Sequence, residues 1–404
     1  MHRYLYLPLI AATGLAAMTA SAQTQHQHAG DAPACTGTGL TCSRVATPAF
    51  GRDGVLWLTW AAGGKVMVAH SDDLARNFSP PVAITKQSVR IDNGPDARPK
   101  IAVGADGQVA VTYAVFQDDK YNGRAYLSRS TDGGASFTEP APITADTTSQ
   151  RFETAAFGPG GDLFVAWLDK RDAAAARAEG KNYPGAALAY AWAGASEKSE
   201  PGATKIAEDQ TCECCRLAVA FAGPRQPIVA FRNIFDGKTR DHAVVTFADP
   251  ATPGPLYRVS NDEWKTNVCP HQGPSLAVAE STYHIAWFTN GQARRGVFYA
   301  RSQDGGAHFS DPMPLGAGHR PERPFVLARG KQVWLTWKEF DGDKTSVVLL
   351  HSADAGANWG TPQLCAITRG GSDHPILVND GDRVFLSWLT REEGYRLIPV
   401  GEPS

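Results

Sequence analysis

The strongest constraint on the fold is a motif of eight residues that occurs four times in the chain. Its form is Ser-x-Asp-x-Gly-x-x-aromatic, with Pro following within a few residues; clear copies span 130–137, 302–309 and 352–359, and a weaker copy spans 71–78. The Asp carboxylate can accept hydrogen bonds from backbone N–H groups of its own turn, and the Gly supplies a position with positive φ. We therefore predict hairpin turns closed by a packed aromatic side chain. The structural acceptors of these turns are Asp73, Asp132, Asp304 and Asp354.

Between these turns a second pattern recurs. A short apolar strand is followed by a turn rich in Gly and Asp and then by a strand that ends in an aromatic residue. The stretches 109–113 and 384–388 show the β-branched and aromatic composition that strands favour. The aromatic positions are Trp60, Tyr113, Trp167, Phe231, Trp287, Trp337 and Trp388. A period of roughly fifty residues with several strands in each unit is typical of β-propeller blades.

The four copies of the motif resemble the Asp boxes, also called BNR repeats, of sialidase-like β-propellers. The resemblance covers nearly the whole chain after the N-terminal region and implies an all-β fold with a single propeller. Seven aromatic-ended hairpins predict seven blades, and six, as in true sialidases, is the alternative. The last repeat, 375–400, has room for only about three strands, so we expect residues 35–45 to supply its outer strand and to close the ring. The insertion 171–183 predicts a short helix.

The N-terminal sequence and the overall charge limit where the protein is located and which partners it binds. Residues 1–22 have the basic start, the apolar run and the small residues before a cleavage site, after Ala22, of a secretory signal peptide. We expect a periplasmic or secreted monomer, with a polar lead-in and closing strand over 23–45 and the propeller over 46–404. No apolar run is long enough to span a bilayer. A net charge of −2 gives no electrostatic case for nucleic acid or a membrane surface.

Strand alternation assigns the loops to two faces. The turn between the first two strands of a blade and the Asp-box turn fall on one face, and the loops that connect successive blades fall on the other. Reactive residues collect in these inter-blade loops, over 92–98, 151–153, 212–216, 269–271, 319–323 and 372–374. We therefore expect the mouth of the central channel on this face to bind a small ligand, a metal ion or an acidic glycan.

Cysteine is the most distinctive residue type in these loops. The chain has seven cysteines; Cys35 and Cys42 are candidates for a disulfide, and Cys365 is expected to be an unpaired, buried thiol. The remaining four, with a nearby histidine, are Cys212, Cys214, Cys215, Cys269 and His271. One interpretation is two disulfides that join adjacent blades of a non-catalytic scaffold, as in other exported proteins. The other is a thiolate–imidazole metal site, and such soft ligands select copper or zinc.

The resemblance to sialidases implies a third interpretation, a glycoside hydrolase that acts on acidic sugars. The family uses three arginines, an Asp acid and a Tyr–Glu pair. The candidate residues here are Arg98, Arg216 and Arg323 for a carboxylate ligand and Glu153 and Asp169 for acid–base chemistry. No Tyr lies in an inter-blade loop, so the nucleophile has no candidate. The sequence leaves open whether the protein is an enzyme, and metal binding at the channel mouth is the leading hypothesis.

Overall fold

The computed structural model describes residues 35–194, 201–249, 251–316 and 320–401. The predicted signal peptide and the lead-in up to residue 34 lie outside the described residues. Among the described residues, no helix is long and apolar enough to cross a membrane.

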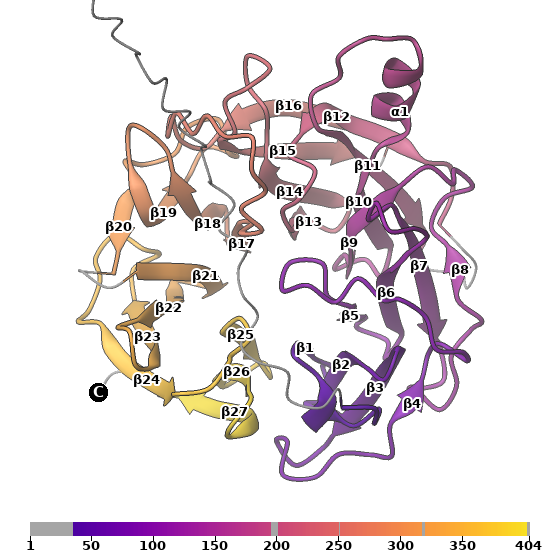
Figure 1. Ribbon diagram of the computed structural model, residues 1–404. Helices are drawn as coiled ribbons and strands as arrows, with labels where there is room; N and C mark the ends of the chain where they lie inside the picture. Colours follow the sequence, from indigo (N-terminus) through magenta and orange to yellow (C-terminus); the bar gives the residue numbers. More distant parts are fainter. Residues whose placement is uncertain (1–34, 195–200, 250, 317–319, 402–404) are drawn as a thin grey trace, which may run out of the picture. The chain divides into compact units, whose positions relative to one another are not determined.

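Residues 36–401 form seven antiparallel sheets that follow one another around a ring, so the predicted seven-bladed propeller is confirmed (Figure 1). The strands of the first three sheets are β1 (Ala46–Phe50), β2 (Leu56–Ala62), β3 (Lys65–Ser71), β4 (Val82–Ala83), β5 (Lys100–Val103), β6 (Val109–Phe116), β7 (Gly123–Ser130), β8 (Ala141–Pro142), β9 (Gln150–Phe157), β10 (Leu163–Asp169), β11 (Ala186–Ala193) and β12 (Lys205–Thr211). The predicted helix in the insertion is α1 (Arg171–Ala178), between β10 and β11.

The other four sheets continue in the same order. Their strands are β13 (Ala218–Gly223), β14 (Gln226–Arg232), β15 (His242–Asp249), β16 (Thr252–Arg258), β17 (Ser275–Ala279), β18 (Thr282–Asn290), β19 (Arg295–Ser302), β20 (Met313–Leu315), β21 (Arg320–Arg329), β22 (Gln332–Phe340), β23 (Thr345–Ser352), β24 (Gln363–Thr368), β25 (Ile376–Asn379), β26 (Val384–Thr390) and β27 (Gly394–Val400). Within each sheet, sequential strands are neighbours.

The second strand of a blade is the most buried because both of its faces are covered by neighbouring blades. Every residue of β2, β10 and β26 is buried, and these strands are correspondingly almost continuous apolar runs. The aromatic residues that mark the repeat, such as Trp167 and Trp287, are fully buried between sheets. Because burial of an aromatic side chain contributes several kcal/mol to folding, stacking of the blades supplies the core.

The Asp-box turns have the predicted hydrogen bonds. In the copy after β19, Ser302 Oγ donates to Asp304 Oδ1 at 2.8 Å, and the backbone N–H of His308 donates to the same oxygen at 3.0 Å. The Gly306 N–H donates to Ser302 Oγ at 2.9 Å, and this glycine has a φ of 93°. The other three copies repeat these contacts.

The aromatic residue that closes each Asp box packs against the preceding blade. Trp359 of the sixth blade contacts Tyr299 of the fifth, with ring centroids 5.0 Å apart. Phe78 of the first blade contacts Tyr395 of the seventh at 5.9 Å. Phe137 and Phe309 join the apolar clusters that lie between their blades and the blades before them. Each Asp box therefore joins two sheets as well as closing a turn.

The seventh sheet differs from the prediction in one respect. It has three strands among the described residues, and β27 lies at its edge. The N-terminal segment does reach the junction of the seventh and first blades, but as a 3-10 turn, Leu40–Cys42, rather than as the expected strand. Leu40 and Cys42 pack in the same apolar cluster as Trp60 of the first blade and Leu389 of the seventh. Gly37, Gly39 and the short spacing to Ser43 favour turns over an extended strand here.

We predict that Asp304→Ala weakens the propeller in a pH-dependent way. Hydrogen bonds, first from the His308 backbone and then from its side chain, lower the pKa of Asp304 to about 2 from its ordinary 3.8. Because the folded pKa is the lower one, this stabilisation is present above the unfolded pKa and is lost as pH falls through the folded pKa. Calorimetry should find a lower Tm for the variant at neutral pH and a smaller difference at about pH 3. Asp311→Ala, an exposed carboxylate just beyond this turn, is the control; an equal effect of both variants would contradict the prediction.

Candidate functional site at the inter-blade loops

The structure places the two classes of loop at opposite ends of the strands, as predicted. Asp132 lies on the turn after β7, on the Asp-box face. The candidate site residues lie at the inter-blade end, namely Arg98 before β5, Glu153 in β9, Asp169 at the end of β10, Cys212, Cys214, Cys215 and Arg216 before β13, Cys269 and His271 before β17, and Arg323 near the start of β21. They do not form one site there but fall into separate groups.

Asp169 holds the insertion in place. It is fully buried and accepts hydrogen bonds from Trp167 Nε1 at 3.0 Å, from the Arg171 backbone N–H at 3.0 Å and from Arg171 Nη2 at 2.7 Å. These donors fix the first residue of α1 and use both carboxylate oxygens. The arrangement gives Asp169 a structural role and leaves it no free oxygen for acid–base chemistry.

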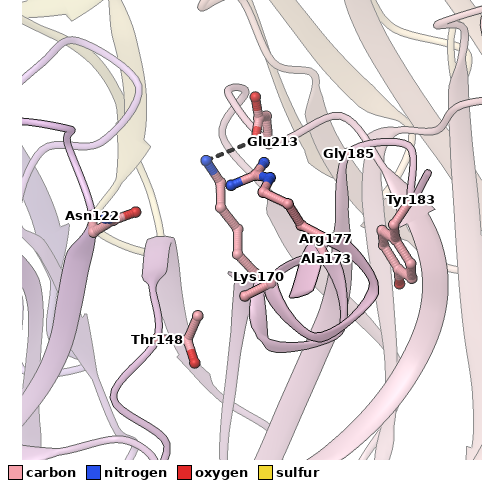
Figure 2. A pocket seen from close by; sticks show the side chains of 9 residues that line it. Asn122, Thr148, Lys170, Ala173, Arg177, Tyr183, Gly185 and Glu213 are labelled. Carbon is pink, nitrogen blue, oxygen red and sulfur yellow. Dashed lines mark ion pairs between the residues drawn. The ribbon is translucent and has the colours of Figure 1, made fainter. Parts of the chain in front are cut away.

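A cavity of about 240 Å³ lies beside α1. It is lined by Asn122, Thr148, Lys170, Ala173, Ala174, Arg177, Tyr183, Gly185 and Glu213. Figure 2 shows the side chains of Lys170 and Arg177 extending toward Glu213, and Lys170 Nζ forms an ion pair with Glu213 at 2.7 Å. Glu213 stands between Cys212 and Cys214 in the chain, so this cavity borders the cysteine-bearing loop.

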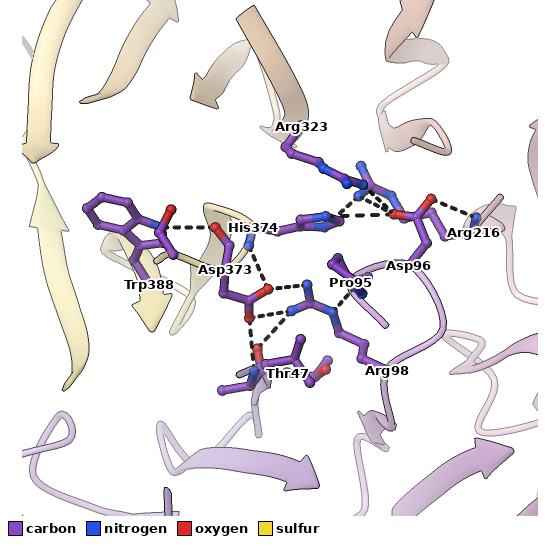
Figure 3. A network of polar contacts seen from close by, with 12 residues as sticks. Thr47, Pro95, Asp96, Arg98, Arg216, Arg323, Asp373, His374 and Trp388 are labelled. Carbon is purple, nitrogen blue, oxygen red and sulfur yellow. Dashed lines mark hydrogen bonds and ion pairs between the residues drawn. The ribbon is translucent and has the colours of Figure 1, made fainter. Parts of the chain in front are cut away.

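The centre of the inter-blade face is occupied by a buried network around Asp96 (Figure 3). Asp96 Oδ1 lies 3.2 Å from Arg323 Nη1 and 3.5 Å from Arg216 Nη1. Arg216 Nη1 also donates to His374 Nδ1 at 2.8 Å. The other ring nitrogen of His374, Nε2, faces Asp96 Oδ1 at 3.7 Å. Since a guanidinium cannot accept a hydrogen bond, Nδ1 is the acceptor and the proton of the neutral ring lies on Nε2.

A second carboxylate, Asp373, binds Arg98 through both oxygens. Arg98 Nη1 donates to Oδ2 at 2.7 Å and Nη2 donates to Oδ1. The backbone N–H groups of Ala46 and His374 donate to the same carboxylate at 2.9 and 2.6 Å. The side chains of Arg98 and Asp373 are 4% and 1% exposed. This pair therefore joins the first, second and seventh blades at the point where the ring closes.

Burial sets the electrostatics of the network. It lowers the pKa of Arg216 to about 10, with Asp96 opposing the shift and Arg323 adding to it. Burial, followed by the charges of Arg98 and Arg323, holds the pKa of His374 well below its ordinary value, so this ring is neutral. Each of the three arginines that the sequence suggested for an external carboxylate thus already binds a carboxylate of the protein itself, Asp96 or Asp373.

Glu153 is buried beside this network and has no exposed oxygen. Both of its carboxylate oxygens lack a hydrogen-bond partner among the described residues. Burial raises the pKa of Glu153 to about 7, and the nearby charge of Lys100 opposes that shift. The group is surrounded by the charges of Lys100, Asp92 and Arg151, and it is fully buried, so a substrate in solvent does not reach it.

The cysteines form a compact cluster. The Sγ atoms of Cys212, Cys214 and Cys215 all lie within 4.8 Å of one another, and all three residues are buried. Cys212 Sγ and Cys214 Sγ are 3.5 Å apart. Cys269, on the neighbouring inter-blade loop, is exposed and lies outside the group of three close Sγ atoms, but interaction with the Cys214 thiol lowers its pKa. None of these four cysteines is in a disulfide.

Two arginines surround the thiols. Arg240 Nη1 donates to Cys212 Sγ at 3.4 Å. Hydrogen bonds from Cys214 and then Cys215 hold the pKa of Cys212 well below its ordinary value, and the charges of Arg232 and Arg240 act in the same direction. The environment therefore favours a thiolate at Cys212, the form of cysteine that binds metals. The pKa of Cys214 is raised by its hydrogen bonds with the other thiols, and that of Cys215 is raised by burial.

Asp96 also fixes the relative position of the two cysteine-bearing loops. Its Oδ2 accepts the backbone N–H of Arg216, the residue after Cys215, at 3.2 Å. The same oxygen accepts the backbone N–H of Gly273, on the loop that carries Cys269, at 2.8 Å. The central network is thus the scaffold on which the cysteine cluster is assembled.

The other cysteines and the histidine that the sequence analysis singled out lie apart from this cluster. The His271 ring lies near that of Phe152, with centroids 6.1 Å apart, and His271 is not in the group of close metal-ligand atoms found among the described residues. Both residues have a positive φ, 48° for His271 and 55° for Phe152. Cys365 lies in β24 and is half-buried without a disulfide. Cys35 and Cys42 are disulfide-bonded, as expected.

Comparison with known proteins supports the fold. No protein-family model and no curated protein sequence matches this chain. A lectin from Burkholderia pseudomallei has a similar structure, with a TM-score of 0.61, 13% identity, and coverage of 89% of this chain and 99% of the lectin. A polysaccharide lyase, an ulvan lyase bound to a ligand of GlcA(1-4)Rha3S, gives 0.57 and 10% identity over 89% and 94% of the chains. The intramolecular trans-sialidase from Ruminococcus gnavus gives 0.46 and 11% over 89% and 96%.

The first two likenesses confirm the predicted architecture, a propeller also found in a lectin and in a polysaccharide lyase. At identities this low, they concern the fold alone, because propellers host many unrelated functions.

Proposed function

We propose that this protein is an exported metal-binding propeller that holds a soft ion, Cu(I) in the first place and Zn(II) as the alternative. The ligands are the thiolates of Cys212, Cys214 and Cys215, with Cys269 as a fourth, exposed ligand. The observation that carries the proposal is the buried group of three Sγ atoms within 4.8 Å of one another. Soft thiolate ligands prefer Cu(I) and Zn(II) to hard cations.

The positive charges around the cluster suit a soft ion bound by thiolates. Three thiolates and one Cu(I) ion carry a formal charge of −2, and the guanidinium groups of Arg232 and Arg240 lie beside the thiols. These two positive charges offset that negative charge at a buried site, where an unbalanced charge is costly. Zn(II) in a structural site takes four ligands, and Cys269 would have to complete its tetrahedron.

The metal-binding proposal is tested on protein purified without chelator under anaerobic conditions. We expect five titratable thiols in the unfolded, metal-free protein, and one Cu(I) per folded chain in competition with a chromophoric Cu(I) chelator. Isolation with three thiols or one, together with mass-spectrometric links among the four clustered cysteines and no copper uptake, would replace the metal site with disulfides that join the fourth and fifth blades.

A sialidase-type hydrolase is the weaker candidate. Each of the three arginines is already paired with a carboxylate of the protein, Arg98 with Asp373 and both Arg216 and Arg323 with Asp96. Glu153 and Asp169 are fully buried. A hydrolase would therefore need the inter-blade loops to rearrange before any substrate carboxylate reached these arginines.

A further inference from the structure

The residues that line the cavity beside α1 differ in their chemistry from those of the cysteine cluster. Its walls come from the loop between β6 and β7, the loop before β9, the insertion and the loop before β13. The lining is mainly polar and charged, with the small side chains of Ala173 and Ala174 between the polar groups. At about 240 Å³ it is smaller than the cavities that hold drug-sized ligands, so it suits a compact polar molecule.

The lining carries one positive charge that the protein does not neutralise. Lys170 is paired with Glu213. The guanidinium group of Arg177 forms no hydrogen bond or ion pair with any other described residue, although it extends into the same space (Figure 2). An arginine fork without a partner at the wall of a cavity is suited to a planar carboxylate.

Two uncharged groups on the other loops are also available. Asn122 Nδ2 donates to Asp118 Oδ2 at 2.6 Å, which fixes the amide and leaves its Oδ1 without a partner among the described residues. Thr148 also lines the cavity, and its hydroxyl group likewise forms no hydrogen bond with any described residue. An acceptor and a hydroxyl facing a cavity are suited to ligand hydroxyl groups.

We propose that this cavity binds a small hydroxylated carboxylate of about the size of an acidic monosaccharide. Its carboxylate contacts Arg177, with Lys170 nearby, and its hydroxyl groups contact Asn122 and Thr148. The proposal goes beyond metal binding and does not depend on it, since no thiol takes part. The insertion creates the site: Asp169 anchors the first residue of α1, and Ala173 packs α1 against the propeller with 8% exposure.

Glucuronate is the probe, and glucose, which lacks the carboxylate, is the matched neutral sugar. Ligand-observed NMR and calorimetry on the full-length protein should find saturable binding of glucuronate, little or no binding of glucose, and weaker binding as salt screens the charge. Arg177→Gln should weaken glucuronate binding at least about tenfold. Lys181→Gln removes another cation of the insertion, one that is exposed and paired with Glu179, and should leave binding unchanged.

Three results would overturn the proposal. These are no saturable binding of glucuronate to the wild-type protein, equal binding of glucose, or an equal effect of the Arg177 and Lys181 variants. Thr148→Val provides a second, uncharged perturbation and should weaken binding without a change in Tm. The metal-binding proposal fails independently, because copper uptake is measured without any sugar present.

Discussion

Arg98→Met is expected to lower the free energy of unfolding by about 3–5 kcal/mol, the range for breaking a buried ion pair by removing one partner. The variant leaves the Asp373 carboxylate buried, with only the backbone N–H groups of Ala46 and His374 as donors. The charge has no route to solvent, because the Asp373 side chain is 1% exposed. Chemical denaturation followed by tryptophan fluorescence measures the effect.

The control is Arg90→Met, which removes the arginine of an exposed pair with Asp119 and should cost at most about 1 kcal/mol. A double variant, Arg98→Met with Asp373→Asn, should recover part of the loss, since no unpaired charge then stays buried. If Arg98→Met costs no more than Arg90→Met, the pair does not hold the ring closed.

Cys214→Ser is expected to lower Cu(I) affinity by about 100-fold or more, because it removes one of three buried ligands and leaves a hydroxyl that binds Cu(I) poorly. Cys214 Sγ lies 3.5 Å from Cys212 Sγ and within 4.8 Å of Cys215 Sγ, so its loss leaves only two of the three clustered thiols. The measurement is competition with a chromophoric Cu(I) chelator at fixed pH.

The matched controls are Cys365→Ser and His271→Ala. Cys365 lies in β24 of the sixth blade, and His271 is outside the group of close Sγ atoms among the described residues, so neither variant should change affinity. Unchanged Cu(I) affinity in the Cys214 variant, or its loss in the Cys365 variant, would contradict the proposed ligand set.

The fold was predictable because the residues that determine its turns and strands lie close together in the sequence. The Asp-box residues contact partners at most a few positions away, as in the bond from the His308 N–H to Asp304, so their spacing alone indicates the turn. The alternation of strands then assigned the loops to faces correctly. The closing segment was predicted less well: residues 35–45 reach the expected junction, but whether they form a strand or a turn depends on packing against Trp60 and Leu389, which no local pattern records.

The candidate site was predictable in its residue types but not in its pairings. Arg98 and Arg323 were identified as potential anion binders, but their partners Asp373 and Asp96 lie 275 and 227 positions away in the chain. The cavity beside α1 was missed because Asn122, Arg177 and Glu213 come from three different blades and their loops. Only the Ala-rich insertion, which interrupts the repeat, signalled that this side of the ring differs from the others.

The hydrogen bond from the Ala46 N–H to Asp373 joins residues that are 327 positions apart. The ring can therefore close only after the last blade has been synthesised. During synthesis from the N-terminus, the first six blades can fold and pack before the seventh is made. Arg98 can form its ion pair only after Asp373, near the C-terminal end, has been synthesised. Until then Arg98 is an unpaired positive charge, and the apolar faces of the first and sixth blades that the seventh blade covers stay exposed. We therefore expect a copy that ends before the seventh blade to lack the Arg98–Asp373 ion pair and to be cleaved by proteases faster than the full-length chain.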